Sequence, residues 1–528
     1  MLAATATSWL AHVLYLGMPF AVGLWLWAGV RCLRAHGDRT RWRGLLVPWL
    51  AAAAASALVV GAVPPTMRMQ FDETSLVGTS QNMHRERIAM MATAAWPAPD
   101  GPAVTDWNLD KRPPLFPFLV SVVHDVTGFR IGNAFAVNAV LFCLLAGTLA
   151  TAVSLALGSA LAGAGTPFLL AGVPLAATAA TSAGFELLAT WLLAVVVLAA
   201  VAFANAPTPA RANWLLASGL LFAQSRYESI VVLAALAGTV AVVVRRWPRD
   251  RFGTILIALA PVLLAPIALL LVHARDPAFY PEANGQALVG LGHFCTHLPP
   301  FVAALFDPTT GGAMAGPLGW VALPGLLWWL LARRARVATA LVAVPLLAVT
   351  GVVLAWFYGG VHESTALRLY LPIAVAAALG PLLVAGLVRH RAVPAVVLGS
   401  AVAWSVLRVD AVRTGAVLPP YNVVQALRAV DAALANVRPD PKRALVVTTV
   451  AQYLLVHDLP AMSPEVFARR ERERDLAAFE VLVLETPLDA LLPQKGDPRA
   501  ILRTRPATLL GRIDGDLPVA VWRLTSGR

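Results

Sequence analysis

Side chains suited to proton transfer and phosphate binding stand at the two ends of one long polar segment, residues 64–129. The adjacent acids Asp72 and Glu73 are near its start, and the adjacent cations Lys111 and Arg112 are near its end. A carboxylate can accept a proton as a general base, and Lys and Arg bind phosphate groups. Taken alone, the acids would cap a helix N-terminus and the cations would contact lipid headgroups. Their combination in one segment favours a catalytic interpretation.

Further charged side chains stand beside apolar stretches later in the chain. Glu186 precedes one stretch, Arg226 and Glu228 lie at the start of another, and Arg368 lies at the start of a third. A plain ion pair is an equally good interpretation of Arg226 and Glu228, as is a helix anchor for Arg368. Ionisable residues at membrane edges nevertheless favour function. His362 could contact a sugar, although a solvated loop suits it better.

Composition excludes a soluble globular protein. The chain has 528 residues, of which 58% are hydrophobic and 13% are charged, and its mean hydropathy is +0.70. Charge is concentrated at the end of the chain, because residues 410–528 hold 30 of the 70 Asp, Glu, Lys and Arg residues. We therefore predict an α-helical polytopic membrane body over residues 1–409 and a small water-soluble α/β domain over residues 410–528.

Apolar stretches of bilayer length predict about twelve transmembrane helices. They cover residues 8–30, 44–63, 130–157, 166–181, 185–204, 212–224, 228–244, 253–272, 318–332, 338–356, 369–388 and 393–408. On that count four arginine clusters fall on one side, which the positive-inside rule makes cytoplasmic. The clusters are at 31–43, 245–251, 333–336 and 389–391. The polar segment and the C-terminal domain then face outward, and the net charge of +12 is a topology signal rather than a nucleic-acid footprint.

Secondary structure outside the membrane can be predicted from residue spacing. In the C-terminal domain, residues 421–437 have helical spacing, and residues 444–450 and 480–485 have the composition of strands. In the polar segment we expect a helix that follows Asp72 and Glu73, over about residues 75–95. An amphipathic helix over residues 115–126 should lie in the membrane interface.

The acids, the cations and the topology together resemble the GT-C class of membrane glycosyltransferases, in its protein O-mannosyltransferase and aminoarabinose-transferase-like branch. Members of that branch carry an Asp-Glu pair in the first large outward loop and a later Lys-Pro-Pro-Leu-like motif. The matching residues here are Asp72-Glu73 and Lys111-Arg112-Pro-Pro-Leu115. One arginine is inserted, which leaves open whether Lys111 or Arg112 takes the role of the family's lysine.

The resemblance extends more weakly over about residues 44–408. Glu186 matches the family's acid after a later span, and Arg226 matches its basic residue after the next hairpin. Arg368-Leu-Tyr370 is similar to the family's Arg-Tyr-rich start of a late span. The resemblance implies a sugar donor linked to polyprenyl phosphate or diphosphate at the outer leaflet. No nucleotide-binding loop is found in the sequence, in agreement with such a donor.

This chemistry assigns a role to each candidate residue. Asp72 and Glu73 are the catalytic acids, and Asp72 takes the proton from an acceptor hydroxyl. Fixed cations stabilise the charge that develops on the leaving phosphate, and the candidates for that role are Lys111, Arg112, Arg226 and Arg368. The predicted substrate-binding residues are Glu186, Glu228, His362 and Tyr370.

We predict no cofactor and no resident metal, although a divalent metal is left open. His293, Cys295 and His297 are close in sequence, but their spacing matches no zinc motif and a polar loop suits them better. The expected partners are the lipid-linked donor and a lipid, glycan or protein acceptor. A secondary transporter and a polyprenyl-linked polysaccharide ligase are the alternatives. The excess of Arg over Lys favours a GC-rich bacterium, which would place the chain in the inner membrane with its C-terminal domain in the periplasm.

Overall fold

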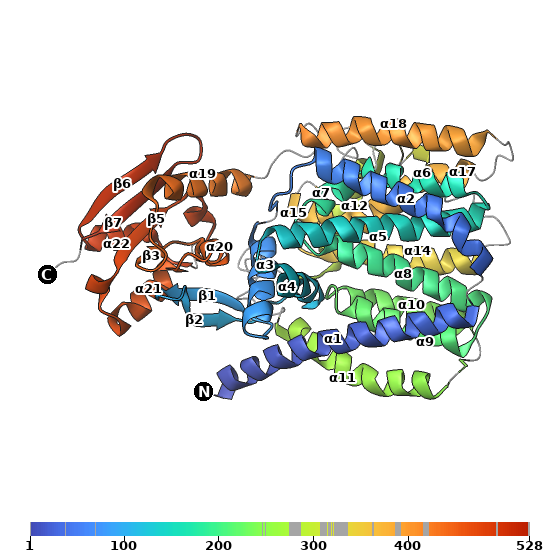
Figure 1. Ribbon diagram of the computed structural model, residues 1–528, viewed down its shortest axis with the longest axis horizontal. Coiled ribbons are helices and arrows are strands. Elements are labelled where there is room, and N and C mark those ends of the chain that lie inside the picture. Colours follow the sequence, from blue (N-terminus) through green and yellow to red (C-terminus); the bar gives the residue numbers. More distant parts are fainter. Residues whose placement is uncertain are drawn as a thin grey trace.

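The structure is a computed structural model of the chain. It describes residues 2–525, apart from residues 37–38, 69, 245–246, 249, 274–286, 307–313, 315–317, 319, 322–335, 362–363, 386–391, 415–421 and 493–494. A helical body and a mixed α/β domain lie end to end along the long axis of the molecule (Figure 1). The predicted fold class, a helical polytopic membrane body with a C-terminal α/β domain, is confirmed.

Helices make up the described part of the body. Their bounds are α1 Leu2–His36, α2 Arg39–Ala62, α5 Gly132–Leu157, α6 Ala160–Ala171, α7 Pro174–Ala180, α8 Glu186–Asn205, α9 Pro209–Ala223, α10 Ser229–Val243, α11 Arg251–His273, α12 Leu291–Phe306, α14 Arg336–Ala355, α15 Ser364–Leu367, η4 Arg368–Tyr370, α16 Leu371–Ala378, α17 Gly380–Ala385 and α18 Val393–Arg413. The predicted domain boundary at residue 409 falls inside α18, four residues before the helix ends.

Seven described helices are long and apolar enough to cross a membrane: α1, α2, α5, α8, α11, α14 and α18. The pair α6 and α7, bent by 80°, is an eighth candidate. The predicted count of twelve is not established. α9 and α10 have only 15 residues each, and most of the predicted span 318–332 lies outside the described residues.

Apolar side chains on the outer helices face away from the bundle. Leu26 and Trp27 of α1 are 53% and 55% exposed, and Leu407 of α18 is 71% exposed. A soluble monomer rarely exposes such continuous apolar faces to water, whereas in a membrane these side chains contact the hydrocarbon chains of the lipids. Together with the membrane-spanning lengths, these faces make the chain a multi-pass membrane protein.

The polar segment between α2 and α5 forms two helices and a hairpin. α3 (Gln70–Arg85) is followed by β1 (Met91–Trp96), β2 (Ala103–Asn108) and α4 (Leu115–Thr127). The helix predicted over residues 115–126 is present as α4, but the helix predicted over about residues 75–95 was wrong in its second half. There β1 pairs antiparallel with β2, and its buried Trp96 packs in a cluster with side chains of the C-terminal domain. These long-range contacts outweigh local helix propensity.

The C-terminal domain contains a five-stranded sheet in the order β4-β3-β5-β7-β6. β3 is parallel to both β4 and β5, whereas β7 is antiparallel to β5 and β6. The strands are β3 Ala444–Val447, β4 Ala461–Met462, β5 Glu480–Glu485, β6 Ala507–Ile513 and β7 Val519–Leu524. The helices are α19 Asn422–Val437, α20 Ala451–Val456, α21 Pro464–Arg470 and α22 Pro498–Thr504, with short 3-10 turns η5 Glu471–Glu473, η6 Leu476–Ala478 and η7 Pro487–Leu491. The predicted helix and both predicted strands are present.

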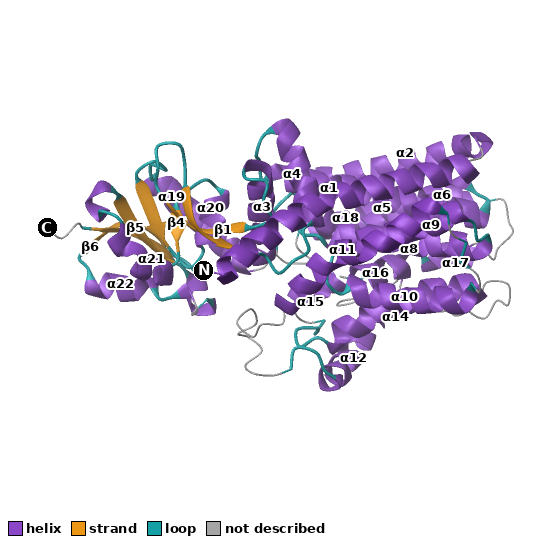
Figure 2. Cartoon of the chain, turned by 90° about the horizontal axis from the view of Figure 1, so that it is seen from below, coloured by secondary structure: helices purple, strands orange, loops and turns teal. Residues whose placement is uncertain are grey.

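Direct contacts join the polar segment to the C-terminal domain. Nε and one terminal nitrogen of Arg470 each donate a hydrogen bond to the Asp106 carboxylate, both at 2.7 Å. The Trp96 ring stacks on Phe479 with centroids 5.7 Å apart, and Gln81 donates to Asp458 at 3.0 Å. In Figure 2 the hairpin reaches from the helical body into the sheet domain. The two parts of the chain therefore meet at a built junction.

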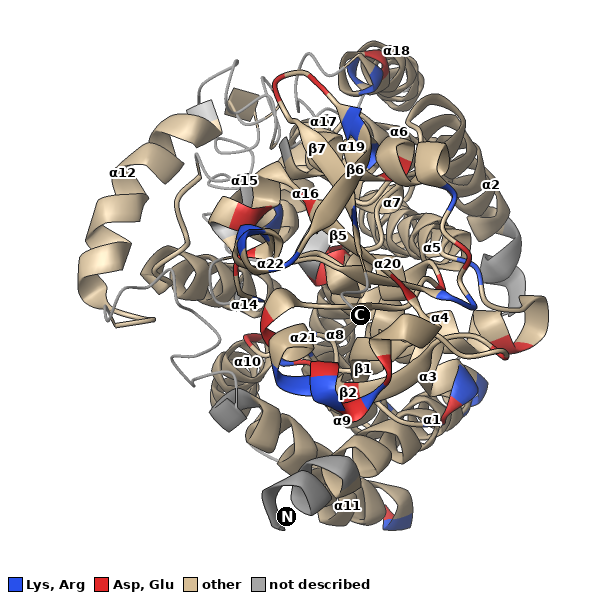
Figure 3. Cartoon of the chain, turned by 90° about the vertical axis from the view of Figure 1, so that its left-hand side faces the viewer, with Lys and Arg blue, Asp and Glu red and all other residues tan. Residues whose placement is uncertain are grey.

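The two ends of the helical body differ in what they carry. Arg31 near the end of α1 pairs with Asp250 just before α11 at 3.0 Å, which joins two of the predicted arginine clusters at the end remote from the C-terminal domain (Figure 1). From the opposite end, Figure 3 shows acidic and basic residues mixed over the C-terminal domain in front of largely uncharged helices. The clusters at 333–335 and 389–391 lie outside the described residues.

Candidate active site

Asp72 lies between two arginines that are distant in sequence. In the first turn of α3, one carboxylate oxygen accepts a hydrogen bond from Arg112 and the other accepts one from Arg368. Arg112 comes from the turn before α4, and Arg368 from η4, 296 residues along the chain from Asp72. The Asp72 side chain is 26% exposed, against 9% for Arg112. The carboxylate is therefore the more accessible member of this cluster.

The ion pairs continue from Arg368 into the bundle. A second nitrogen of Arg368 lies 2.7 Å from Oε1 of Glu186, the first residue of α8. Arg226 lies 3.6 Å from the same oxygen and also pairs with Glu228, while its guanidinium sits 4.6 Å above the Phe185 ring. Acids and bases thus alternate from Asp72 to Glu228. Charged side chains can be buried in an apolar bundle when each one is paired with a charge of opposite sign, as it is here.

The segment ahead of Glu186 is held in place by backbone contacts. The Asn138 amide of α5 donates to the carbonyls of Ser182 and Gly184 at 2.7 and 2.8 Å. A Cβ atom on Gly184 would lie 2.2 Å from Oε2 of Glu186, so any larger residue at this position would displace the carboxylate. α8 begins directly afterwards and presents Glu186 in its first turn, where the helix dipole favours an acid.

Asp110 orients Arg112 toward Asp72. Its carboxylate accepts from the Arg112 side chain at 2.6 Å and from the Arg112 backbone amide at 3.3 Å. Asp110 is 7% exposed, and Lys111 between them is half-buried. Sequence reasoning missed Asp110, although its position two residues before an arginine and next to a proline turn was an available signal.

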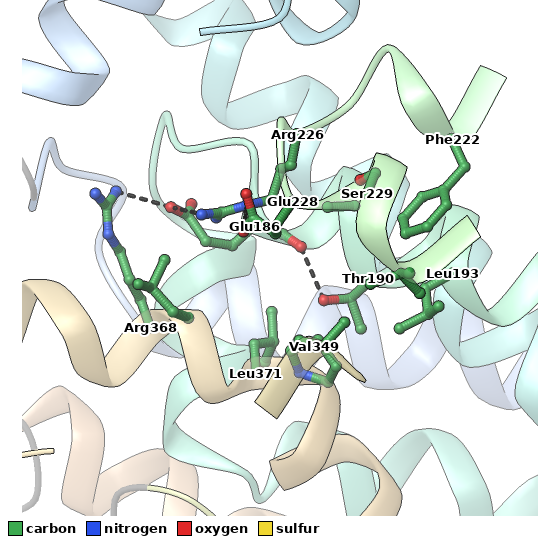
Figure 4. Close-up of a pocket in the computed structure, with 14 residues that line it drawn as sticks. Glu186, Thr190, Leu193, Phe222, Arg226, Glu228, Ser229, Val349, Arg368 and Leu371 are labelled. Carbon is green, nitrogen blue, oxygen red and sulfur yellow. Dashed lines mark hydrogen bonds and ion pairs between the residues drawn. The ribbon is translucent and has the colours of Figure 1, made fainter. Parts of the chain in front are cut away.

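A narrow cavity of about 20 Å³ lies beside the row of ion pairs that runs from Asp72 through Arg368, Glu186 and Arg226 to Glu228. Its charged lining consists of Glu186, Arg226, Glu228 and Arg368, and apolar residues of α8 and α16 close it on the inner side. Figure 4 shows Arg226 and Glu228 facing this space, with Arg368 at one side and Thr190 deeper in the bundle. Such a volume holds about one water molecule. A larger ligand fits only if ion pairs open.

Six of the ten predicted site residues meet in this cluster: Asp72, Arg112, Glu186, Arg226, Glu228 and Arg368. Lys111 adjoins it in sequence. Glu73 points elsewhere, because its two carboxylate oxygens accept from the backbone amides of Ala183, at 2.9 Å, and Arg68. This acid ties the start of α3 to the segment before α8.

The remaining two predicted residues lie outside the cluster or outside the described chain. The Tyr370 hydroxyl donates to the carbonyl of Gly359 at 2.6 Å, and its ring stacks on Phe301 with centroids 4.8 Å apart. Tyr370 therefore packs against α12 and is absent from the described lining of the cavity. His362 lies outside the described residues.

No group of three metal-ligating side chains occurs among the residues that the structure describes. Of the histidine and cysteine residues noted in the sequence, His293 contacts the Ala287 carbonyl at 2.8 Å and His297 contacts the Leu354 carbonyl at 3.0 Å. These residues lie on helix α12 and not on the polar loop that we expected. Their contacts are those of helix-surface side chains.

The fold that carries this cluster is of the GT-C type. No family model and no curated protein matches the sequence, but solved structures match the fold. The crystal structure of ArnT from Cupriavidus metallidurans bound to undecaprenyl phosphate has a TM-score of 0.57 at 14% identity, covering 92% of this chain and 98% of that chain. The apo structure of the same protein has a TM-score of 0.56 at 16% identity, covering 90% and 97%. At such identities the likeness establishes the fold alone.

Proposed function

We propose that this protein is a membrane glycosyltransferase that uses a sugar linked to a polyprenyl phosphate. One observation carries the proposal: an acid, Asp72, lies between Arg112 and Arg368 at the end of the bundle that faces the C-terminal domain. The matching fold of ArnT, described with bound undecaprenyl phosphate, supports a donor of the same chemical class. The cations then bind the donor phosphate, and the acid accepts the proton of the acceptor hydroxyl.

The proposed transfer has a simple balance of bonds and protons. The acceptor hydroxyl oxygen forms a bond to the anomeric carbon as the bond from that carbon to the phosphate oxygen breaks. The phosphate leaves with the electron pair, and the hydroxyl proton passes to the Asp72 carboxylate, which later releases it to water. Arg112 and Arg368 stabilise the charge on the leaving phosphate. Of the two predicted acids, Asp72 suits the base role, because Glu73 is occupied by backbone amides.

The ion pairs of the cluster balance the charges of both arginines within the protein. Asp72 and Glu186 neutralise Arg368, and Asp72 and Asp110 neutralise Arg112. A donor phosphate would replace Asp72 as the partner of both arginines, since guanidinium groups bind phosphate and carboxylate in the same geometry. That exchange would open the row for the sugar and leave Asp72 without its counterions, facing the acceptor.

The distribution of charge supports an outward-facing reaction. The ion pair Arg31–Asp250, which joins two of the arginine-rich segments, lies at the end of the bundle remote from the cluster, and clustered Arg and Lys mark the cytoplasmic side. We therefore place the cluster and the C-terminal domain in the periplasm of a bacterial inner membrane. The acceptor is a hydroxyl on a lipid, glycan or protein. The gathering of charges at one end of the bundle favours this function over a secondary transporter, whose site lies at mid-membrane.

The proposal can be tested with purified protein in lipid nanodiscs. We expect Asp72→Asn to lower transfer from a polyprenyl-phosphate-linked sugar by about 10²–10⁴-fold, while Asp514→Asn, an exposed acid of the C-terminal domain, changes nothing. Mass spectrometry of envelope glycolipids and glycoproteins from cells with and without the gene supplies the acceptor. Full transfer by a folded Asp72→Asn protein would refute the proposal.

A further inference from the structure

A second and larger cavity lies away from the ion-pair cluster, at the junction between the hairpin and the C-terminal domain. Its volume is about 300 Å³, within the range of small-molecule sites. β1 and β2 form one wall, and the residues that follow β3 and β4 form the other. We call this cavity the junction pocket. None of its lining residues belongs to the row from Asp72 to Glu228.

The position of the junction pocket in the sheet is one that binds ligands in many α/β domains. β3 has parallel neighbours on both sides, β4 and β5. The chain leaves β3 toward β4, but it leaves β5 toward β6, which lies beyond β7 on the other side of the sheet. Such a reversal opens a crevice at the carboxyl ends of the strands. Thr449, two residues after β3, and Lys495, in the connection after β5, both line the pocket.

The polar lining suits a neutral ligand with many hydroxyl groups. Asn108 and Gln452 supply amide donors and acceptors, Thr449 supplies a hydroxyl, and Trp107 supplies a flat aromatic surface. These groups come from both walls of the pocket. A sugar ring presents the complementary pattern, with hydroxyls at its edge and C–H groups on its face.

The charged lining is already balanced and therefore disfavours an anion. Arg470 and Arg469 face Asp106, at 2.7 and 3.7 Å. Burial lowers the pKa of the Lys495 ammonium, and the negative charge of Glu465 partly opposes this change. The two acids that line the pocket, Asp106 and Glu465, thus balance its two cations, Arg469 and Lys495. A phosphate would be repelled by the acids.

We propose that the junction pocket binds a monosaccharide unit of the acceptor, an inference that rests on the proposed function. The hairpin that forms one wall lies in the chain between α3, which carries Asp72, and the turn that carries Arg112. A sugar held at Trp107 and Gln452 would thus be fixed relative to both reacting side chains. The protein would recognise its acceptor at a distance from the hydroxyl that reacts.

The test is direct binding to the full-length protein in nanodiscs. The probes are methyl glycosides of glucose, galactose, mannose, N-acetylglucosamine and arabinose, with inorganic phosphate as the anionic probe. Their binding is measured by saturation-transfer-difference NMR and by calorimetry. We expect at least one glycoside to bind with a millimolar dissociation constant, and Gln452→Ala or Asn108→Ala to weaken it about tenfold or more. The matched control is Gln425→Ala, an exposed glutamine of α19, which should bind as the unmodified protein does. Thermal unfolding of each variant verifies that it is folded.

Three results would overturn the inference: no glycoside binding up to tens of millimolar, binding that the folded pocket variants do not weaken, or binding of phosphate alone. Its failure is distinguishable from failure of the proposed function. Asp72→Asn should lose transfer and still bind the glycoside, whereas Gln452→Ala should raise the KM for the acceptor without changing the KM for the donor. A glycoside that binds the pocket in a protein whose transfer does not need Asp72 would refute the function alone.

Discussion

Arg368 joins Asp72 to Glu186. One terminal nitrogen of its guanidinium contacts the Asp72 carboxylate, and the other lies 2.7 Å from Oε1 of Glu186. The two acids come from different helices, α3 and α8, and a single planar side chain holds both. The site is therefore a shared network, in which a change at one charge alters its neighbours.

Replacement of Arg368 tests the need for this double contact. Lysine keeps the charge but has a single ammonium in place of the fork, so we expect Arg368→Lys to fold and to lose about tenfold or more of its transfer rate. Arg368→Ala leaves two acids without their common partner and should cost about 3–5 kcal/mol of stability. Transfer rates and thermal unfolding measure the two effects. Arg413→Lys, at an exposed pair in α18, is the control, and equal activity of both lysine variants would contradict the network.

Neutralising Asp72 should have opposite effects on binding and on transfer. In Asp72→Asn, Arg112 and Arg368 each lose one of their two carboxylate partners and keep only Asp110 and Glu186, so they are more available to a phosphate. We expect undecaprenyl phosphate to bind about tenfold more tightly, equivalent to about 1.4 kcal/mol, although transfer is lost. Calorimetry in nanodiscs measures the affinity. Weaker binding of the lipid phosphate would show that Asp72 does not compete with it for the arginines.

Replacement of Gly184 should move the Glu186 carboxylate, because the backbone of Gly184 lies close to it. An added Cβ would lie 2.2 Å from the Glu186 carboxylate, which must then move away from Arg226 and Arg368. We expect Gly184→Ala to lower transfer to about the level of Glu186→Gln, with a loss of stability of about 1–3 kcal/mol from overpacking. Gly61→Ala in α2, where nothing lies within 4 Å of the new atom, should behave as the unmodified protein. A fully active Gly184→Ala would mean that the position of Glu186 is unimportant.

A buried histidine in helix α4 should make stability depend on pH. Burial lowers the pKa of His124 to about 4, and its ring contacts Ser80 at 3.1 Å and Asn133 at 2.7 Å. Between about pH 6.5 and 4 the unfolded chain binds a proton there that the folded chain does not, so stability falls as the pH falls through this range. The contribution is at most about 3 kcal/mol.

Thermal unfolding between pH 7 and 4.5 measures this dependence. His124→Gln should flatten the curve below pH 6.5, because the residue that gains a proton on unfolding is gone. His293→Gln, at an exposed contact of α12, should leave the dependence of stability on pH unchanged. An unchanged slope in the His124 variant would assign the acid sensitivity to other groups.

Several features of this protein follow from the sequence by itself, because they depend on local composition. Apolar stretches of bilayer length identified the membrane body, and the density of charge identified the C-terminal domain. The spacing of residues 421–437 and 480–485 predicted a helix and a strand that are present as α19 and β5. The polar segment 64–129 was singled out for its charged residues, and two of them, Asp72 and Arg112, lie in contact in the folded chain.

The remaining features were decided by contacts between residues distant in the chain. Residues 91–96 form a strand because Trp96 packs on the C-terminal domain, and no local pattern contains that information. Asp72 and Glu73 are adjacent acids of equal chemistry in the sequence. Only the folded chain directs Asp72 to Arg112 and Arg368 and directs Glu73 to backbone amides. Successive helical residues point about 100° apart, so neighbours in sequence have different surroundings, and a partner 296 residues away decides which one is part of the site.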